Sequence, residues 1–339
     1  MIKEAISKVV IGVDLGEEEM VGVMNEIMSG ACSPAQIGSF ITALRMKGET
    51  IAEITGAARV MRDKAARVDG GTGDGILVDT CGTGGDSSGT FNVSTTAAFV
   101  VAGAGVTVAK HGNRSITSKC GSADVLEALG VNLDLNPDQV GKCIREVGIG
   151  FMFAPVMHGA MKHAIGPRRE IGIRTVFNIL GPLTNPAGAN VQVMGVFDPA
   201  LIGKLAAVLG KLGALRAMVV CGAGNMDELT VTGETKVAEW RDGQVSEYTV
   251  NPEDVGLARA TIDDIKGKDN AGAAADHLRQ ILSGEPGPCL DMVLLNAGAA
   301  LTAAGKATDL KGGVDLARQI VANGAALAKV NGLVGFSAN

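Results

Sequence analysis

The sequence has few aromatic side chains and no excess of positive charge. Phe, Trp and Tyr make up 3% of its 339 residues, and 36 acidic side chains outnumber 30 basic ones, giving a net charge of −6. A protein that binds nucleic acid over a broad surface usually carries a basic face. The charge balance therefore argues against nucleic acid as a partner and leaves room only for a local basic pocket. The length suffices for one large domain or two moderate ones.

Paired cysteines and long apolar runs are also missing. The six cysteines are far apart, at 32, 81, 120, 143, 221 and 289, and no C-x-x-C pair occurs, which excludes a zinc ribbon or a redox motif of that type. We expect them to be reduced thiols. No stretch of about 18 uninterrupted apolar residues occurs, so we expect no membrane span and no membrane partner. The charged start of the chain lacks the apolar core of a signal peptide, and we expect a cytoplasmic location.

Glycine, by contrast, is abundant, with 48 residues, and three of these form a single turn. Gly82, Gly84 and Gly85 follow an apolar run that predicts a buried strand, and a helix is expected to begin near Asn92. A glycine turn between a strand and a helix leaves backbone N–H groups free to bind an anion. Because the turn ends in Asp86, it favours a phosphate that carries magnesium or a sugar. The alternative is a tight turn that binds no ligand.

The first 66 residues predict helices with short breaks and no strand. Apolar residues recur at helical spacing over 15–28, 35–46 and 50–68, and Ser33-Pro34 is typical of an N-cap followed by proline at the first helical position. A glycine-rich connector over 69–75 follows, which we interpret as either a hinge or a plain surface loop.

From residue 76 onward, strand-like and helix-like segments alternate, which indicates a mainly parallel sheet with helices on its faces. Short antiparallel strands are expected between 229 and 250, with a hairpin turn at Asp242-Gly243. The section from about 270 is helical and rich in alanine. The predicted parallel strands are 76–80, 106–109, 149–153, 191–196 and 217–221, the predicted helices are 93–103, 122–130, 137–147 and 199–212, and the predicted antiparallel strands are 229–232, 236–240 and 245–250.

Three unusual loops follow the strands predicted at 76, 106 and 217. Ligands of parallel sheets bind beyond the carboxyl ends of the strands, so we expect these loops to meet. The second loop, 110–122, combines basic side chains, hydroxyls, His111 and Asn113, and Ser122 opens a helix. The third loop brings Asp227 and Glu228 together, oxygen ligands of the kind that magnesium prefers. Taken separately, the alternatives are a solvated polar loop and a surface acid pair.

The first loop does not match the common nucleotide motifs. No lysine follows its glycines, so it is no P-loop, and Ser87 stands where the last glycine of a dinucleotide fingerprint would be. Asn92 suits an N-cap, and Ser94 and Thr95 add hydroxyls to the first helical turn, which fits a diphosphate or ordinary capping.

A further segment predicts a pocket for a flat apolar molecule with an acidic group. Pro155 and His158 lie in an apolar stretch, and Arg168 and Arg169 follow, an arginine being able to bind a carboxylate with two hydrogen bonds. Surface or structural roles for His158 and His163 are the alternative. No H-E-x-x-H zinc motif occurs.

Four stretches together resemble the anthranilate phosphoribosyltransferase family: Cys81-Gly-Thr-Gly-Gly-Asp86, Asn92-Val-Ser-Thr95, Lys110-His-Gly-Asn-Arg114 and Gly121-Ser-Ala-Asp124. The resemblance covers nearly the whole chain, including the segment 174–186 and Asp227-Glu228. It implies an α/β protein with a small all-helical domain and a larger domain whose mainly parallel central sheet is flanked by helices. The implied domains are 1–75, with a helical connection near 165–190, and 76–164 together with 191–339.

The resemblance also implies the activity: transfer of phosphoribose from phosphoribosyl pyrophosphate to the amine of anthranilate, with magnesium, by a homodimer. It implies catalytic roles for His111, Lys110 and Arg168 and magnesium ligation by Ser94, Asp227 and Glu228. The implied substrate-binding residues are Gly82, Gly85, Asp86, Thr90, Asn92, Ser94, Thr95, Lys110, Asn113, Ser118, Ser122, Pro155, His158 and Arg168.

The chemistry of the acceptor amine indicates which role to expect for His111. The amine of anthranilate is already neutral at pH 7, so it needs to be positioned more than activated. We therefore expect His111 to orient the amine or accept its proton late. Two alternatives are kept: a pyrimidine nucleoside phosphorylase, which is similar in fold and glycine turn, and a non-catalytic relative that binds nucleic acid.

Overall fold

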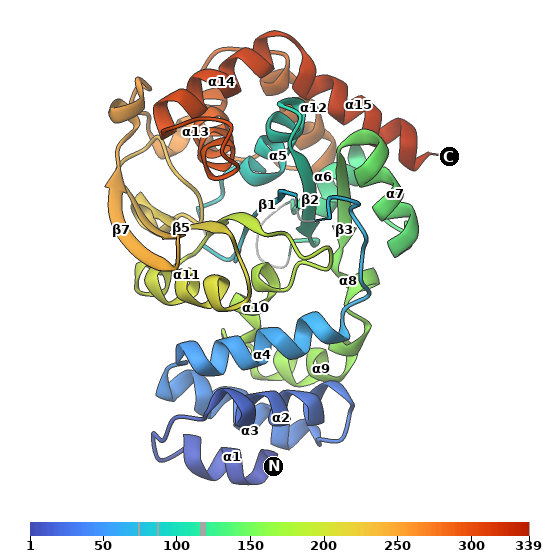
Figure 1. The fold of residues 1–339 in the computed structure, drawn as a ribbon, viewed down its shortest axis with the longest axis vertical. Helices are drawn as coiled ribbons and strands as arrows, with labels where there is room; N and C mark the ends of the chain where they lie inside the picture. Colours follow the sequence, from blue (N-terminus) through green and yellow to red (C-terminus); the bar gives the residue numbers. More distant parts are fainter. Residues whose placement is uncertain (74, 87, 116–119, 339) are drawn as a thin grey trace.

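The computed structural model describes residues 1–73, 75–86, 88–115 and 120–338. A block of helices lies at one end of the molecule and a sheet flanked by helices at the other (Figure 1). Ser33 and Thr50 each cap a helix through the hydroxyl, with Gln36 and Glu53 completing the capping boxes, so the N-cap predicted at Ser33 is confirmed. The first four helices are α1 (Ile2–Val9), α2 (Glu17–Met28), α3 (Pro34–Lys47) and α4 (Ile51–Lys64).

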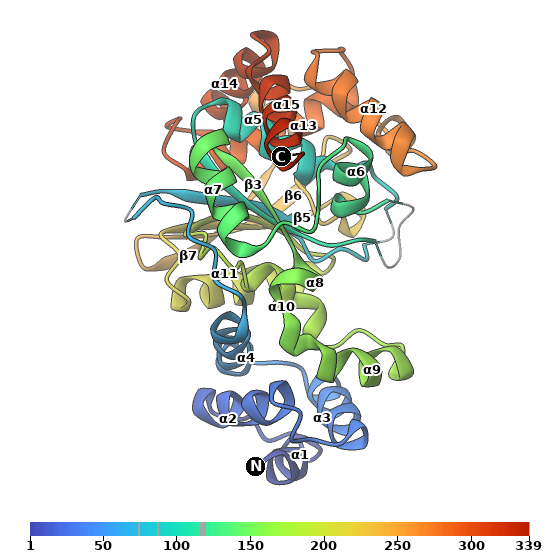
Figure 2. The ribbon, with the colours of Figure 1, turned by 90° about the vertical axis from the view of Figure 1, so that its right-hand side faces the viewer.

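Two later helices return to this block. Helix α9 (Lys162–Ile171) packs against α2 and α3, and α10 (Phe177–Leu183) packs against α4 (Figure 2). The predicted helix over 50–68 ends earlier, at Lys64, because Ala65 already has extended backbone. The exact domain boundaries given above stay predictions.

The sheet has seven strands in the order β3-β2-β1-β4-β5-β6-β7. The first five are parallel, and β6 and β7 are antiparallel additions at one edge. The fold class predicted from the sequence is confirmed. The strands are β1 (Leu77–Gly82), β2 (Thr107–Gly112), β3 (Ile149–Phe153), β4 (Val191–Gly195), β5 (Arg216–Gly222), β6 (Thr235–Arg241) and β7 (Gln244–Val250).

Helices cover both faces of the sheet. One face carries α5 (Val93–Gly103) and the C-terminal helices in a single apolar cluster, and α11 (Ile202–Lys211) covers the other face beside the helical block. Helix α5 is buried almost throughout, as its apolar sequence predicts. The remaining helices are α6 (Ser122–Ala128), α7 (Pro137–Val147), α8 (Ala154–Met157), α12 (Ala271–Leu282), α13 (Pro288–Ala303), α14 (Leu310–Ala322) and α15 (Ala325–Ser337); short 3-10 turns are η1 (Gly159–Met161), η2 (Pro199–Leu201), η3 (Ala223–Asn225), η4 (Pro252–Val255) and η5 (Ile262–Ile265).

The antiparallel edge corrects one prediction. The hairpin at Asp242-Gly243 is confirmed, with positive φ at both residues. The strand predicted over 229–232 is wrong, because side chains take the backbone groups that a neighbouring strand would need. Leu229 is bonded through both its N–H and its carbonyl to the amide of Asn296, and the N–H of Thr230 donates to Thr235 Oγ1.

No single helix in the described part of the chain is both long and apolar enough to cross a membrane; only α14 and α15 taken together, bent by 63°, match by length and composition. All six cysteines have free thiols.

Candidate active site

The three predicted loops meet at the carboxyl edge of the sheet. The N–H of Gly84 donates to Asp227 Oδ2 at 2.6 Å, which joins the loop after β1 to the loop after β5. The ammonium of Lys110, near the end of β2, donates to the carbonyl of Thr80 on β1 at 2.6 Å. The predicted meeting of these loops is therefore confirmed.

Glycine is required here by close packing as well as by backbone shape. Gly84 and Gly85 have φ of 66° and 74°, so the turn after β1 needs them. Gly82 and Gly195 are partners in the register of β1 and β4, and the loop carrying Asp227 lies against both. A Cβ on Gly195 would overlap the carbonyl oxygen of Asp227, and one on Gly82 would overlap its carboxylate.

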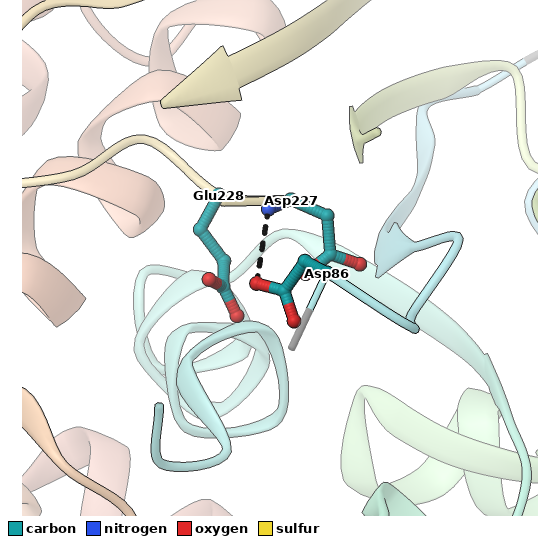
Figure 3. A group of neighbouring side chains, drawn as sticks. All are labelled: Asp86, Asp227 and Glu228. Carbon is teal, nitrogen blue, oxygen red and sulfur yellow. Dashed lines mark hydrogen bonds between the residues drawn. The ribbon is translucent and has the colours of Figure 1, made fainter. Parts of the chain in front are cut away.

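Asp86, Asp227 and Glu228 bring their carboxylates together (Figure 3), with ligand atoms within 4.8 Å of one another. The N–H of Asp227 donates to Asp86 Oδ2 at 3.4 Å. Burial, followed by the charge of Asp86, raises the pKa of Asp227 to about 7, and burial with the charge of Asp227 also raises the pKa of Glu228. Buried like charges of this kind are stabilised by a cation, so the three acids fit a magnesium ion.

Ser94 lies with Lys110 at the first turn of α5. Lys110 Nζ is 3.4 Å from Ser94 Oγ, and Thr80 Oγ1 donates to the backbone carbonyl of Ser94. Lys110 is 3% exposed, and burial lowers its pKa while the charge of Asp79 opposes that change. No carboxylate is paired directly with this ammonium among the described residues, which leaves it available to an anion. Ser94 also lines a small cavity with Asp227 and Glu228.

Other predicted donor-binding residues surround this edge. Thr90 Oγ1 lies 3.4 Å from Glu228 Oε2, and Thr95 is buried in α5. Asn92 occupies the N-cap position, but its side-chain oxygen accepts no N–H of the helix and its Nδ2 donates to the carbonyl of Cys120, so its predicted side-chain cap is wrong. Ser118 lies outside the described residues.

The second loop differs in part from expectation. The carbonyl of Asn113 accepts from Ser122 Oγ at 3.1 Å, which closes the loop at the start of α6. Arg114, counted among its basic side chains, is neutralised by Asp124 and Glu127. Asp124 also accepts from the N–H of Gly121, so part of this helix N-terminus is already occupied.

His111 and His158 form a buried pair, with their Nε2 atoms 3.2 Å apart. Both rings are buried, and burial lowers the pKa of His111 to about 3 and of His158 to about 4. The backbone of Gly181 acts in the opposite direction and raises the pKa of His111, but by less than burial lowers it. Nearby Pro155, at the start of α8, is exposed.

We expect these two histidines to stay neutral throughout the physiological range. Since both folded-state pKa values lie below the ordinary 6.5, this pair stabilises the fold fully above pH 6.5, and the contribution is lost as pH falls towards 4 and below. NMR titration of the imidazole resonances should show no charge change for either ring above pH 5. A midpoint near 6.5 for His111 would contradict the burial described above.

Arg168 on α9 is half-buried, with its guanidinium 5.2 Å from the ring centroid of Phe177. Burial lowers its pKa, and no acidic partner is paired with it within the described ranges. A desolvated guanidinium without a carboxylate is suited to bind one from a ligand. Neighbouring Arg169 is exposed.

Comparison with known proteins agrees with this geometry. The α/β-domain model of the glycosyl transferase family matches residues 74–327, and the helical-bundle-domain model matches residues 3–65. The anthranilate phosphoribosyltransferase of Desulfotalea psychrophila is 62% identical over 99% of this chain and 97% of its own, and that of Trichlorobacter lovleyi is 58% identical over 98% and 99%.

The chain belongs to the anthranilate phosphoribosyltransferase family.

Solved structures of this family share the whole fold. The crystal structure of the anthranilate phosphoribosyltransferase from Thermus thermophilus has a TM-score of 0.93 at 46% identity and covers 99% of both chains. The enzyme of Saccharomyces cerevisiae, in complex with PRPP and Mg, has a TM-score of 0.89 at 26% identity over 99% of this chain and 98% of its own. The predicted family is thus confirmed, and these relatives are transferases, which decides against the phosphorylase and nucleic-acid alternatives.

Several residues of this transferase site were not singled out from the sequence. Asp79 is fully buried on β1 and accepts from the N–H of His111 and the amide of Asn185. Burial raises the pKa of Asp79 to about 6. Arg174 stacks on Phe197 and donates to the carbonyl of Gly85. An acid inside an apolar strand, as in Val78-Asp79-Thr80, is the one signal that could have identified Asp79.

Proposed function

We propose that this chain transfers the phosphoribosyl group of 5-phosphoribosyl 1-pyrophosphate to the amine of anthranilate, a step of tryptophan biosynthesis. The observation that carries the proposal is the meeting of the glycine turn, Lys110 and the Asp227-Glu228 pair at one sheet edge. Its support is a family in which the yeast enzyme has been seen with PRPP and Mg.

The donor is held by the loops after β1 and β2. Lys110, the glycine turn and the start of α5 supply the positive groups and N–H donors that a diphosphate needs. Magnesium, held by Asp227 and Glu228 with Ser94, would offset the charge that develops on the leaving diphosphate. Asp86 lies close enough to both acids to take part. The proposed donor-binding residues are Gly82, Gly85, Asp86, Thr90, Asn92, Ser94, Thr95, Lys110, Ser118 and Ser122.

The acceptor is held on the side of α8 and α9. Arg168 binds the carboxylate of anthranilate, and Asn113, Pro155 and His158 line its place. The amine nitrogen attacks C1 of the sugar as the bond from C1 to the diphosphate oxygen breaks. The amine then gives up one proton to the released diphosphate or to water. The neutral ring of His111, which is held in place by its contact with His158, orients the amine.

One assay tests the reaction directly. Mixing the protein with donor, magnesium and anthranilate should remove the fluorescence of anthranilate. A second assay offers a pyrimidine nucleoside and inorganic phosphate, and it should show no release of base. Release of base without any change in anthranilate would overturn the proposed reaction.

We expect the double change Asp227→Asn with Glu228→Gln to raise the magnesium concentration needed for half-maximal rate. The two amides lose the charge that draws the ion, so the increase should exceed about 10-fold. The measurement is the rate as a function of magnesium at fixed donor. Asp315→Asn, an exposed acid on α14, is the control and should leave the curve in place. An unchanged curve for the double variant would remove both acids as ligands.

We further propose that the protein is a cytoplasmic homodimer joined through the helical block. Large apolar side chains are exposed there, among them Ile11 at 76% and Met46 at 83%. Such exposure is typical of a surface that a second chain covers. Sedimentation equilibrium gives the mass in solution, and a monomer at all concentrations would contradict the dimer.

A further inference from the structure

A single polar side chain in the middle of α13 contacts the loop that carries the acid pair. Asn296 is 6% exposed on a helix whose other buried residues are apolar except for Thr302 near its end. A buried amide is costly unless it is hydrogen-bonded. Asn296 meets that requirement through Met292 on its own helix and through Leu229, which directly follows Glu228.

The side-chain amide of Asn296 hydrogen-bonds both backbone groups of Leu229. Asn296 Oδ1 accepts from the N–H of Leu229 at 3.1 Å, and Asn296 Nδ2 donates to the carbonyl of Leu229 at 2.7 Å. Nδ2 also donates to the carbonyl of Met292, one turn earlier on α13, at 2.9 Å. The backbone next to Glu228 is thereby fixed to the helix at two points.

The carboxylate of Glu228 has little else to fix it. Its described partner is Thr90 Oγ1, at 3.4 and 3.5 Å, which is at the limit of a hydrogen bond. Asp227 is better held, by the N–H of Gly84 at 2.6 Å. The place of Glu228 is therefore set mainly by its backbone, and so by Asn296.

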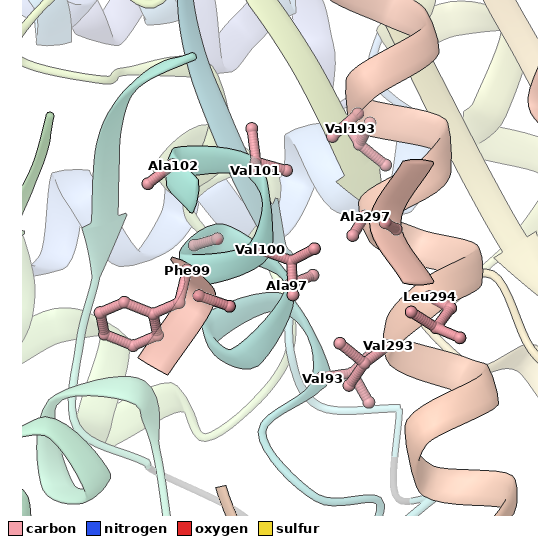
Figure 4. Packing of buried hydrophobic residues seen from close by; sticks show 14 of the residues in the cluster. Val93, Ala97, Phe99, Val100, Val101, Ala102, Val193, Val293, Leu294 and Ala297 are labelled. Carbon is pink, nitrogen blue, oxygen red and sulfur yellow. The ribbon is translucent and has the colours of Figure 1, made fainter. Parts of the chain in front are cut away.

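Helix α13 also packs against α5, the helix that carries Ser94. Val293, Leu294 and Ala297, which flank Asn296, lie among residues of α5 in one apolar cluster (Figure 4). At its other end α13 is tied to the start of β5, where Arg216 donates to the carbonyl of Thr302 at 2.7 Å. Helix α13 is thus hydrogen-bonded to this segment at two places: at Arg216, where β5 begins, and at Leu229, next to Glu228.

The same small cavity is lined by Ser94, Asp227, Glu228 and Asn296. We infer that Asn296 is a positioning residue that sets the distance between Glu228 and the Ser94 end of α5, and so tunes the affinity for the divalent cation. The inference rests on the proposed role of Asp227 and Glu228 as ligands. Groups behind metal ligands typically change metal affinity about 10- to 100-fold when they are replaced.

A matched control exists at the other ends of the parallel strands, where β1 and β4 begin. Asn190 makes the same kind of contact, with Oδ1 accepting from the N–H of Leu77 at 3.0 Å and Nδ2 donating to the carbonyl of Gly75 at 2.9 Å. Asn190→Ala removes a comparable pair of hydrogen bonds, at the start of β1 and away from the acids. Comparison of the two variants separates a loss of stability from a loss of metal affinity.

The experiment is calorimetric titration of magnesium into the full-length protein with phosphoribosyl pyrophosphate bound and no anthranilate present. Asn296→Ala should weaken magnesium binding about 10- to 100-fold, and Asn190→Ala should leave it unchanged while lowering the unfolding temperature. Asn296→Ser, which keeps a small polar group in place of the amide, should fall between wild type and Asn296→Ala and serves if the alanine variant does not fold.

Unchanged magnesium affinity in a folded Asn296 variant would overturn the inference and leave Asn296 with a structural role only. Equal weakening by Asn190→Ala would also overturn it, since the effect would then follow general stability. The titration of Asp227→Asn with Glu228→Gln is run alongside. If that double variant binds magnesium like wild type, the proposed ligands are wrong, whatever the Asn296 variants show.

Discussion

Gly195→Ala should reduce the rate of transfer by about 100-fold, because it displaces the loop of the proposed metal ligands Asp227 and Glu228 by a distance on the order of an ångström. Gly195 ends β4, and the carbonyl of Asp227 lies where the new Cβ would stand. A backbone carbonyl cannot yield like the end of a flexible side chain. The whole turn from Asp227 to Glu228 must therefore move away from Gly84 and Asp86.

The measurement is the steady-state rate at saturating anthranilate, with magnesium titrated to find whether more metal restores it. Gly272→Ala, in the first turn of α12, is the control, because its nearest neighbour is Asn270 Oδ1 at 3.4 Å, an ordinary contact. If Gly195→Ala had a normal rate and a normal magnesium dependence, the loop that carries Asp227 and Glu228 would not be packed against Gly195 as described.

Arg168→Ala should raise the KM for anthranilate by about 100-fold or more, since a partly buried carboxylate then loses its charged partner. The KM for the donor should stay close to that of wild type, because Arg168 lies on α9 and the donor loops follow β1 and β2. Steady-state kinetics with each substrate varied in turn give both constants.

Two further variants test whether the effect is specific to the guanidinium of Arg168. Arg169→Ala removes the neighbouring, exposed guanidinium and should leave both constants unchanged. Arg168→Lys keeps the charge but loses the planar pair of donors, so it should recover only part of the affinity. Equal losses for donor and anthranilate in Arg168→Ala would contradict the assignment of this residue to the acceptor.

The sequence predicted the parts of the fold that local patterns determine. The apolar runs ending at Val78 and beginning at Val191 gave strands, and Asp242-Gly243 gave its hairpin, because each signal lies within a few residues. The meeting of the three loops was also predictable, since parallel strands place their carboxyl ends at one edge.

What the sequence could not predict depends on residues far apart in the chain. The segment 229–232 has the composition of a strand, but Asn296, 67 residues later, takes the backbone of Leu229. Asp86 joins the acid pair across 141 residues, and no local pattern announces that its partner is Asp227. Arg114 is one of the basic side chains noted in the sequence, and nothing in its local pattern indicates that Glu127, 13 residues later, neutralises it.

The order of the strands reverses direction beside β1, since the chain builds outward to β2 and β3 and then returns to place β4 on the other side of β1. The groups proposed for the sugar donor follow β1 and β2, whereas Arg168 and His158 come from the segment between β3 and β4. Apart from His111 and Asn113, which belong to the end of β2 and the loop after it, the residues proposed for the nucleophile thus come from a separate stretch of chain. Mutations between β3 and β4 can therefore change which aromatic amine is accepted without altering the residues that bind the phosphoribosyl donor.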